Sequence, residues 1–209
     1  HPVAHSFPTR RSSDLLIINY IKMHGIGNDY IYLNGFQWDL SEINLSNLAR
    51  VISNRNFGIG ADGLVCILPG KEYPIKMRMF NSDGSEAEMC GNAIRCVAGF
   101  CFQEKIITKK IFAIETIATP IKVEILNNGN IRADMGTPNL ILDQIPVKLP
   151  KEFQEEGKKS HQYSIKTSKF QGKFTPVSMG NPHAVYFLQD IDSLDLEQFG
   201  PLLEHHEFF

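Results

Sequence analysis

The sequence predicts an α+β fold in which strands outnumber helices. Three observations predict this fold class. Short β-branched and apolar runs recur along the chain, two segments repeat apolar residues at helical spacing, and the composition shifts near residue 135. Since a domain usually takes roughly 100 to 200 residues, the 209 residues suffice for two small domains. We expect a first domain over 16–134 and a second over 135–209.

A strand, a turn and a second strand are expected to begin the first domain. Residues 16–22 read LIINYIK, a β-branched and aromatic run, and a similar run, YIYL, covers 30–33. Gly25 and Gly27 lie between the two runs, and glycine favours a turn. The pattern therefore predicts a β-hairpin.

The first helix is predicted by apolar residues at positions i, i+3, i+4 and i+7. These residues are Leu45, Leu48, Ala49 and Ile52. Ser41 or Ser46 is expected to cap the start of this helix, and Gly58 ends the pattern.

The rest of the first domain is expected to consist of strands around a second helix. Apolar, β-branched runs predict strands at 64–68, 75–80, 111–115, 121–126 and 131–135. Turn residues follow two of these strands, at 81–84 and 127–130. Helical spacing returns at Ile94, Val97, Ala98 and Cys101. The second helix is therefore expected to open near Gly91.

The second domain is predicted to contain mainly strands. The charged segment 148–162 is expected to be a loop. Strands are predicted at 163–166, 174–177 and 184–188, and an acidic stretch with apolar positions at 194, 196 and 199 follows them.

The composition argues against two classes of partner. The chain has 21 Lys and Arg residues against 23 Asp and Glu residues, a formal charge of −2, whereas nucleic-acid-binding domains usually carry a clear basic excess. Apolar runs are far shorter than the roughly 20 residues of a membrane-spanning helix. We therefore expect neither a nucleic acid nor a membrane as partner.

The four cysteines are too few and too unevenly spaced for a disulfide scaffold or a paired zinc site. They are Cys66, Cys90, Cys96 and Cys101. Free thiols in the cytoplasm are expected. Cys66 lies in an apolar strand, and Cys96 and Cys101 lie beyond the first turn of the predicted helix, so these three are interpreted as structural.

The two ends are expected not to belong to the complete fold. Residues 1–15 show no periodicity and are interpreted as a leader foreign to the protein, in preference to a twin-arginine signal at Arg10 and Arg11. The last residues, LLEHHEFF, are interpreted as a cut in a longer protein.

The densest cluster of polar and reactive residues is NSDGSEAEMCGNAIRC, over 81–96. Cys90 directly precedes the expected helix, where free N–H groups and the helix dipole favour negative charge. Thiols at helix N-termini ionise more readily, so Cys90 is placed to act as a thiolate base or nucleophile. The N–H groups of Gly91 and Asn92 could hold a carboxylate. The alternative interpretation is that Cys90 is a small buried apolar residue.

Two further motifs combine glycine, asparagine and histidine. They are MHGIGND at 23–29 and SMGNPH at 178–183. The first is interpreted as a turn that lets Asn28 face a polar ligand, because it lies between strands and not before a helix, as a phosphate loop would. Either motif could instead be a turn that satisfies its own backbone. A cysteine site with His24 or His183 lacks paired spacing, so no metal is expected.

In this order, the three motifs over 23–29, 80–96 and 178–183 resemble the diaminopimelate epimerase family. The resemblance extends to GIGADG at 58–63, MGTP at 135–138 and GPLLE at 200–204. It implies two similar domains, each a mostly antiparallel sheet wrapped around a central helix, with the second domain incomplete here.

The resemblance implies an isomerase without cofactor or metal. One thiolate removes the α-proton of an amino acid and a thiol on the opposite face returns one, which converts L,L-diaminopimelate to the meso isomer for lysine and peptidoglycan synthesis. The implied partner is this small amino-acid substrate, and a homodimer is left open. Two alternatives are a racemase of another amino acid on the same fold and a binding remnant without catalysis.

The resemblance also assigns site residues. Cys90 matches the first thiol of the pair, and His183 matches a residue that tunes the cysteine pair. Positions that hold the substrate match Asn28, Asn81, Gly91, Asn92 and Asn181.

The chain departs from the family pattern at two places. Gly63 stands where some members have a glutamine that touches substrate. The family's second cysteine lies in a later glycine-rich motif, and no cysteine follows Cys101 here. We therefore expect this chain to lack the second acid/base, to leave strand edges unpaired and to be inactive as an epimerase on its own.

Overall fold

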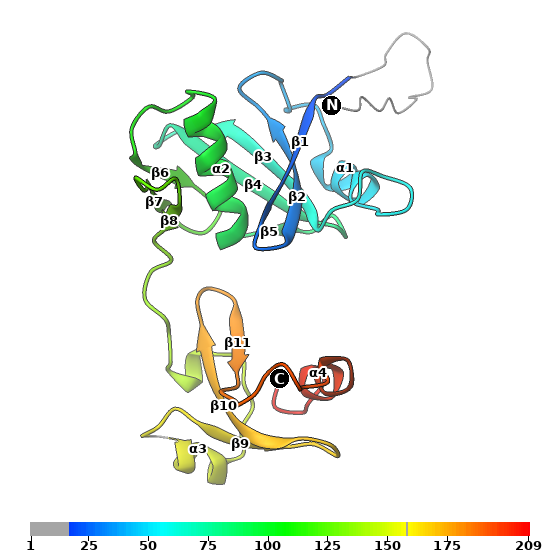
Figure 1. The fold of residues 1–209 in the computed structure, drawn as a ribbon, viewed down its shortest axis with the longest axis vertical. Coiled ribbons are helices and arrows are strands. Elements are labelled where there is room, and N and C mark those ends of the chain that lie inside the picture. Colours follow the sequence, from blue (N-terminus) through cyan, green and yellow to red (C-terminus); the bar gives the residue numbers. More distant parts are fainter. Residues whose placement is uncertain (1–16, 158) are drawn as a thin grey trace. The chain divides into compact units, whose positions relative to one another are not determined.

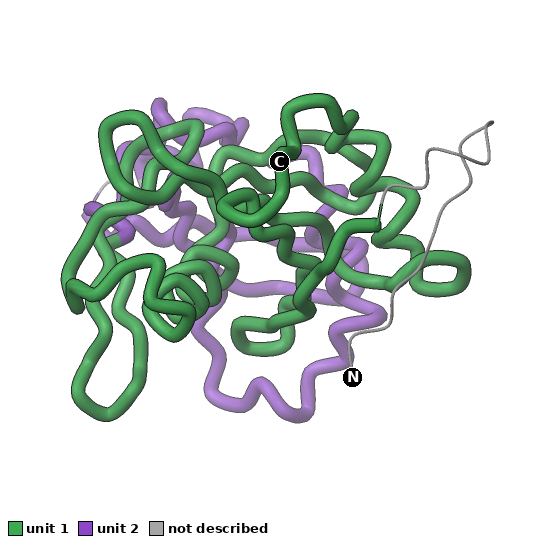
Figure 2. The backbone as a smooth tube through the Cα atoms, turned by 90° about the horizontal axis from the view of Figure 1, so that it is seen from above, with its two compact units in different colours: residues 1–134 green, residues 135–209 purple. Residues whose placement is uncertain are grey.

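The computed structural model describes residues 17–157 and 159–209 (Figure 1). The chain divides into two compact units, 1–134 and 135–209, each described by itself below (Figure 2). The expected leader over 1–15 lies outside the described residues.

The first unit is built on a mixed sheet in the order β1-β2-β3-β4-β6-β7-β8, with β5 paired to β4 (Figure 1). The strands are β1 Tyr20–Gly25, β2 Asn28–Asn34, β3 Gly63–Pro69, β4 Ile75–Asn81, β5 Glu86–Ala87, β6 Ile111–Glu115, β7 Ile121–Ile125 and β8 Ile131–Ala133. The pairs β2/β3 and β4/β6 are parallel, and the other pairs are antiparallel. The sheet is therefore mostly antiparallel, as expected.

Two helices cover the two faces of this sheet. They are α1, Leu45–Ile52, and α2, Gly91–Gln103. Tyr32 and Val65 point into the core that contains the apolar residues of α2, whereas their neighbours Ile31 and Leu64 point into the core that contains those of α1. Because successive strand residues face opposite sides of a sheet, α2 packs on one face and α1 on the other.

The predicted first helix is confirmed, but its predicted caps are wrong. Asn44 caps α1 by accepting a hydrogen bond from the backbone N–H of Asn47 at 3.0 Å. Ser41 lies outside the helix, and the hydroxyl of Ser46 donates to the backbone oxygen of Gly84 at 2.6 Å. A tertiary contact therefore takes the Ser46 side chain away from capping.

The predicted hairpin is confirmed with a shifted first strand, a longer second strand and a tighter turn. β1 continues to Gly25 and β2 begins at Asn28, so most of the segment expected as a loop is strand. The turn consists of Ile26 and Gly27 with φ values of 54° and 84°, which is the backbone conformation of a two-residue hairpin turn.

The second unit holds a three-stranded antiparallel sheet in the order β11-β10-β9. Its elements are the 3₁₀ turn η1 Leu142–Gln144, α3 Lys151–Gly157, β9 Tyr163–Lys166, β10 Gln171–Ser178, β11 Pro182–Val185 and α4 Leu196–Glu204. The loop predicted over 148–162 is wrong, because it contains α3. Phe153 of this helix packs against Phe208 in a tilted arrangement with ring centroids 5.8 Å apart, so aromatic packing favours the helix.

Within 17–157 and 159–209, the helices are too short or too polar to cross a lipid bilayer.

Candidate functional site

Cys90 is the N-cap residue of α2 and directly precedes its first residue, Gly91. Its backbone is extended, with φ −140° and ψ 119°, and its carbonyl accepts the first helical hydrogen bond, from Ile94 N, at 2.9 Å. Its half-buried side chain makes no capping bond to the helix among the described residues. The sulfur is therefore available to groups on the neighbouring strand.

That strand is β2, which brings two polar groups to the sulfur. Cys90 Sγ lies 3.5 Å from Asn28 Oδ1 and 4.0 Å from the hydroxyl of Tyr30. The thiol donates to the amide oxygen, and the phenol donates to the sulfur. Sequence reasoning missed Tyr30, although its place two residues after Asn28 puts both side chains on one face of the strand.

The hydroxyl of Tyr30 keeps its proton and can donate a hydrogen bond to the Cys90 sulfur. Burial raises the pKa of Tyr30 to about 12, and the neighbouring Cys90 adds to the effect. The phenol therefore stays protonated at neutral pH and can donate to either form of the thiol.

A glycine allows β1 and β2 to reach the start of α2. A Cβ on Gly25 would lie 2.9 Å from the backbone oxygen of Asn92 and 3.0 Å from its Cβ. Such a close approach excludes larger residues. Gly25 therefore allows close packing next to the turn that leads into Asn28.

Behind Asn28 lies a network of ion pairs. Asp62 Oδ2 accepts from Asn28 Nδ2 at 2.6 Å and from the backbone N–H of Asp29 at 3.0 Å. Arg55 Nη2 bridges the two carboxylates, at 2.7 Å from Asp29 Oδ1 and 2.8 Å from Asp62 Oδ1. Lys22 Nζ lies 3.0 Å from Asp29 Oδ2. Arg55, with a smaller contribution from Lys22, holds the pKa of Asp29 well below its usual range.

The depressed pKa of Asp29 makes stability depend on pH. Its contribution is present above the unfolded-state pKa of about 4 and is lost as the pH falls through the lower folded-state value. We expect Arg55→Gln to lower the urea midpoint at pH 7 and to lower it less at pH 3. Urea unfolding at both pH values measures the difference, and Arg132→Gln, which breaks the more exposed pair with Glu124, serves as control. An equal loss at both pH values would contradict this origin.

Three other expected site residues lie in the first unit. The Asn81 amide, at the end of β4, donates to the Ser85 hydroxyl at 2.9 Å. Gly91 is the first residue of α2, so its N–H belongs to the turn that lacks helical acceptors. Asn92 Oδ1 accepts from Arg95, which leaves its NH₂ group as the donor to offer a ligand. The structure thus gathers Asn28, Gly91 and Asn92 around Cys90.

The backbone around Gly63 leaves no room for a side chain at this position. It pairs with Tyr30 on one side and with Asn81 on the other. A Cβ at this position would lie 2.1 Å from the backbone oxygen of Phe80 and 3.0 Å from Tyr30 Cε1. In this backbone, Phe80 and Tyr30 therefore occupy the space that a glutamine side chain at position 63 would need.

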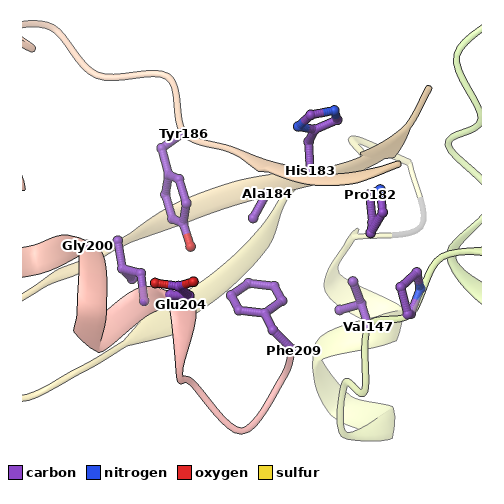
Figure 3. A pocket seen from close by; sticks show the side chains of 10 residues that line it. Val147, Pro182, His183, Ala184, Tyr186, Gly200, Glu204 and Phe209 are labelled. Atoms are coloured by element: carbon purple, nitrogen blue, oxygen red, sulfur yellow. The ribbon is translucent and has the colours of Figure 1, made fainter. Parts of the chain in front are cut away.

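Asn181 and His183 lie in the second unit. The carbonyl of Asn181 accepts from Met179 N at 3.1 Å in the turn between β10 and β11. His183 is exposed on β11, opposite Val177, at the rim of a cavity of about 530 Å³. Figure 3 shows Tyr186, Glu204 and Phe209 pointing toward one another in the same cavity.

The other cysteines fit the structural interpretation. Burial raises the pKa of the Cys66 and Cys101 thiols to about 12, and Cys96 packs half-buried against the α2 core. Within the described part of the chain, no three His, Cys, Asp or Glu side chains are grouped as metal ligands would be.

Comparison with known proteins assigns a family to this arrangement. A sequence model described as diaminopimelate epimerase matches residues 20–141. The diaminopimelate epimerase of Carboxydothermus hydrogenoformans is 47% identical over 193 residues, which cover 92% of this chain and 68% of that protein. The chain belongs to the diaminopimelate epimerase family.

Other relatives agree with this assignment. The diaminopimelate epimerase of Acetivibrio thermocellus is 45% identical over 197 residues, covering 92% of this chain and 67% of that protein. The chain spans about two thirds of the length of the curated epimerases it matches. A phenazine biosynthesis protein of the PhzF family from Bacillus anthracis shares the fold, with a TM-score of 0.54 at 15% identity over 90% of this chain and 62% of that one.

Proposed function

We propose that the chain carries one thiol half of a diaminopimelate epimerase site, with Cys90 as the base. The observation that supports this role is the convergence of the Cys90 sulfur, the Asn28 amide and the first N–H groups of α2. A substrate carboxylate bound at Gly91 and Asn92 would bring its α-carbon beside the sulfur.

The proposed step is a proton transfer. The Cys90 thiolate takes the α-proton, so the C–H bond breaks and an S–H bond forms. The electron pair left on the α-carbon delocalises into the carboxylate, where the N–H groups of α2 stabilise the added charge. Return of a proton to the opposite face inverts the centre, and return to the same face restores it.

The remaining expected residues complete the proposal. Asn28, Asn81 and Asn181 hold polar groups of the substrate, and His183 tunes the cysteine pair. Inversion needs a second proton donor, and no cysteine after Cys101 supplies one. The 209-residue chain is therefore expected to exchange the α-proton with retention of configuration.

Substrate profiling in deuterated water tests this function. We expect loss of the α-proton signal by NMR with L,L-diaminopimelate and not with L-lysine, which lacks the second carboxylate. Exchange on lysine or proline would favour a racemase of another amino acid on this fold. Binding of diaminopimelate without exchange would favour the binding remnant.

We also propose a cytoplasmic location, which the four free cysteines support because disulfides are rare in that compartment. A monomer and a homodimer are both compatible with the proposed function. Sedimentation velocity separates them.

A further inference from the structure

The Asn28 amide lies between a carboxylate and a thiol, and its orientation follows from the carboxylate. Asp62 Oδ2 is 2.6 Å from the amide atom that faces it. An ionised carboxylate has no proton to donate, so this amide atom must be the NH₂ nitrogen. The amide oxygen is then the atom that faces Cys90 Sγ, at 3.5 Å.

Asp62 is itself fixed by hydrogen bonds to its carboxylate and to its backbone. Its Oδ2 also accepts from Asp29 N, and its Oδ1 pairs with Arg55 at 2.8 Å. Its backbone N–H donates to Asp29 O at 2.8 Å, and its carbonyl accepts from Ser82 N at 3.1 Å. Because both carboxylate oxygens and both backbone groups are bonded, the acceptor presented to Asn28 is fixed.

The orientation of the amide matters for the thiol. An amide oxygen accepts a hydrogen bond from S–H and repels S⁻, whereas an NH₂ group in its place would stabilise S⁻. Tyr30, next to the sulfur, and Tyr32, further along β2, are the titratable side chains of that strand that interact with Cys90. The Tyr30 phenol can donate to the thiol and to the thiolate alike. The Asn28 amide is therefore the group whose orientation distinguishes the thiol from the thiolate.

We infer that Asp62 is a positioning residue. By binding the Asn28 NH₂ group, it turns the amide oxygen to Cys90, where this oxygen accepts the hydrogen bond of the thiol. The catalytic meaning of this inference rests on the proposed function, because Cys90 can act as the base only after the proton that the Asn28 oxygen accepts has left the sulfur. The effect on the thiol is a property of the folded chain and does not depend on turnover.

The test is the pH profile of Cys90 alkylation by iodoacetamide in the 209-residue chain. Trypsin cleaves after Arg78 and Arg95, so the peptide 79–95 contains Cys90 as its one cysteine. Mass spectrometry of this peptide reports Cys90 alone. We expect Asp62→Ala to move the midpoint of the profile to lower pH by about one unit, because the freed amide can present its NH₂ group to the sulfur.

Asp62→Asn is the matched variant. It removes the carboxylate charge and keeps an oxygen that can accept from Asn28, so a profile close to that of the unsubstituted chain is expected. If Asp62 acted by its charge, Asp62→Asn would shift the profile as Asp62→Ala does, and the inference would be wrong. Asp39→Ala, which removes an exposed carboxylate that accepts from Ser41, is expected to leave the profile unchanged.

Asn28→Ala keeps the inference testable if Asp62→Ala does not fold, as judged by circular dichroism. Loss of the amide oxygen is expected to move the profile to lower pH, and an unmoved or raised midpoint would overturn the inference. Where both variants fold, Asp62→Ala should add no shift in the Asn28→Ala background. If the midpoints of the alkylation profile shift as expected but no α-proton exchange is seen, the proposed function is contradicted and the positioning role of Asp62 is still supported.

Discussion

Replacing Cys90 by alanine is expected to reduce α-proton exchange on diaminopimelate by about 10³-fold, the range expected for loss of a positioned base. The proposed base is the only thiol that contacts Asn28 among the described residues, and neither the Tyr30 phenol nor the amide can replace it at neutral pH. The measurement is the rate at which the α-proton NMR signal is lost in deuterated water, relative to the unsubstituted chain.

Cys96→Ala is the matched control for this substitution. Cys96 is also half-buried on α2 and packs against the same core, so a general effect of losing a sulfur from this helix would appear in both variants. We expect Cys96→Ala to keep its exchange rate. Exchange that persists in Cys90→Ala would show that Cys90 is not the base.

The parts of the fold that follow from local pattern were predictable. The apolar spacing from Ile94 to Cys101 and the Gly91-Asn92 pair located the start of α2, and this start places Cys90. The apolar, β-branched runs likewise located the strands around it. Such signals succeed because each depends on residues within a turn or two of one another.

The parts that depend on distant partners were not predictable. The Asn28–Asp62 and Tyr30–Cys90 contacts join residues 34 and 60 positions apart. The motif over 58–63 was visible as a family signature, but its pattern gives no reason why an aspartate stands at 62. The cap of α1 was missed for the same cause, since the contact between Ser46 and Gly84 spans 38 positions.

Placing a methyl group on Gly63 is expected to destabilise the first unit by about 3 kcal/mol. The Cβ of Gly63→Ala would lie 2.1 Å from Phe80 O, and this oxygen belongs to β4, which cannot move without separating two paired strands. The gain in strand propensity over glycine is about 1 kcal/mol at most, so the steric cost prevails. The change in free energy of unfolding is measured in urea.

Gly99→Ala in α2 is the control within the same unit. Its Cβ would meet Ile131 Cδ1, the end of a flexible side chain, at 2.9 Å, and alanine is favoured over glycine in a helix by about 1 kcal/mol. We expect little change or a small gain. A loss of stability in Gly63→Ala no larger than in Gly99→Ala would show that β3 and β4 can separate to admit a side chain. A glutamine at Gly63, as in some members of the family, would then fit this backbone. With the predicted loss, the glycine instead fixes the distance between Tyr30 and β4, and with it the donor that reaches Cys90.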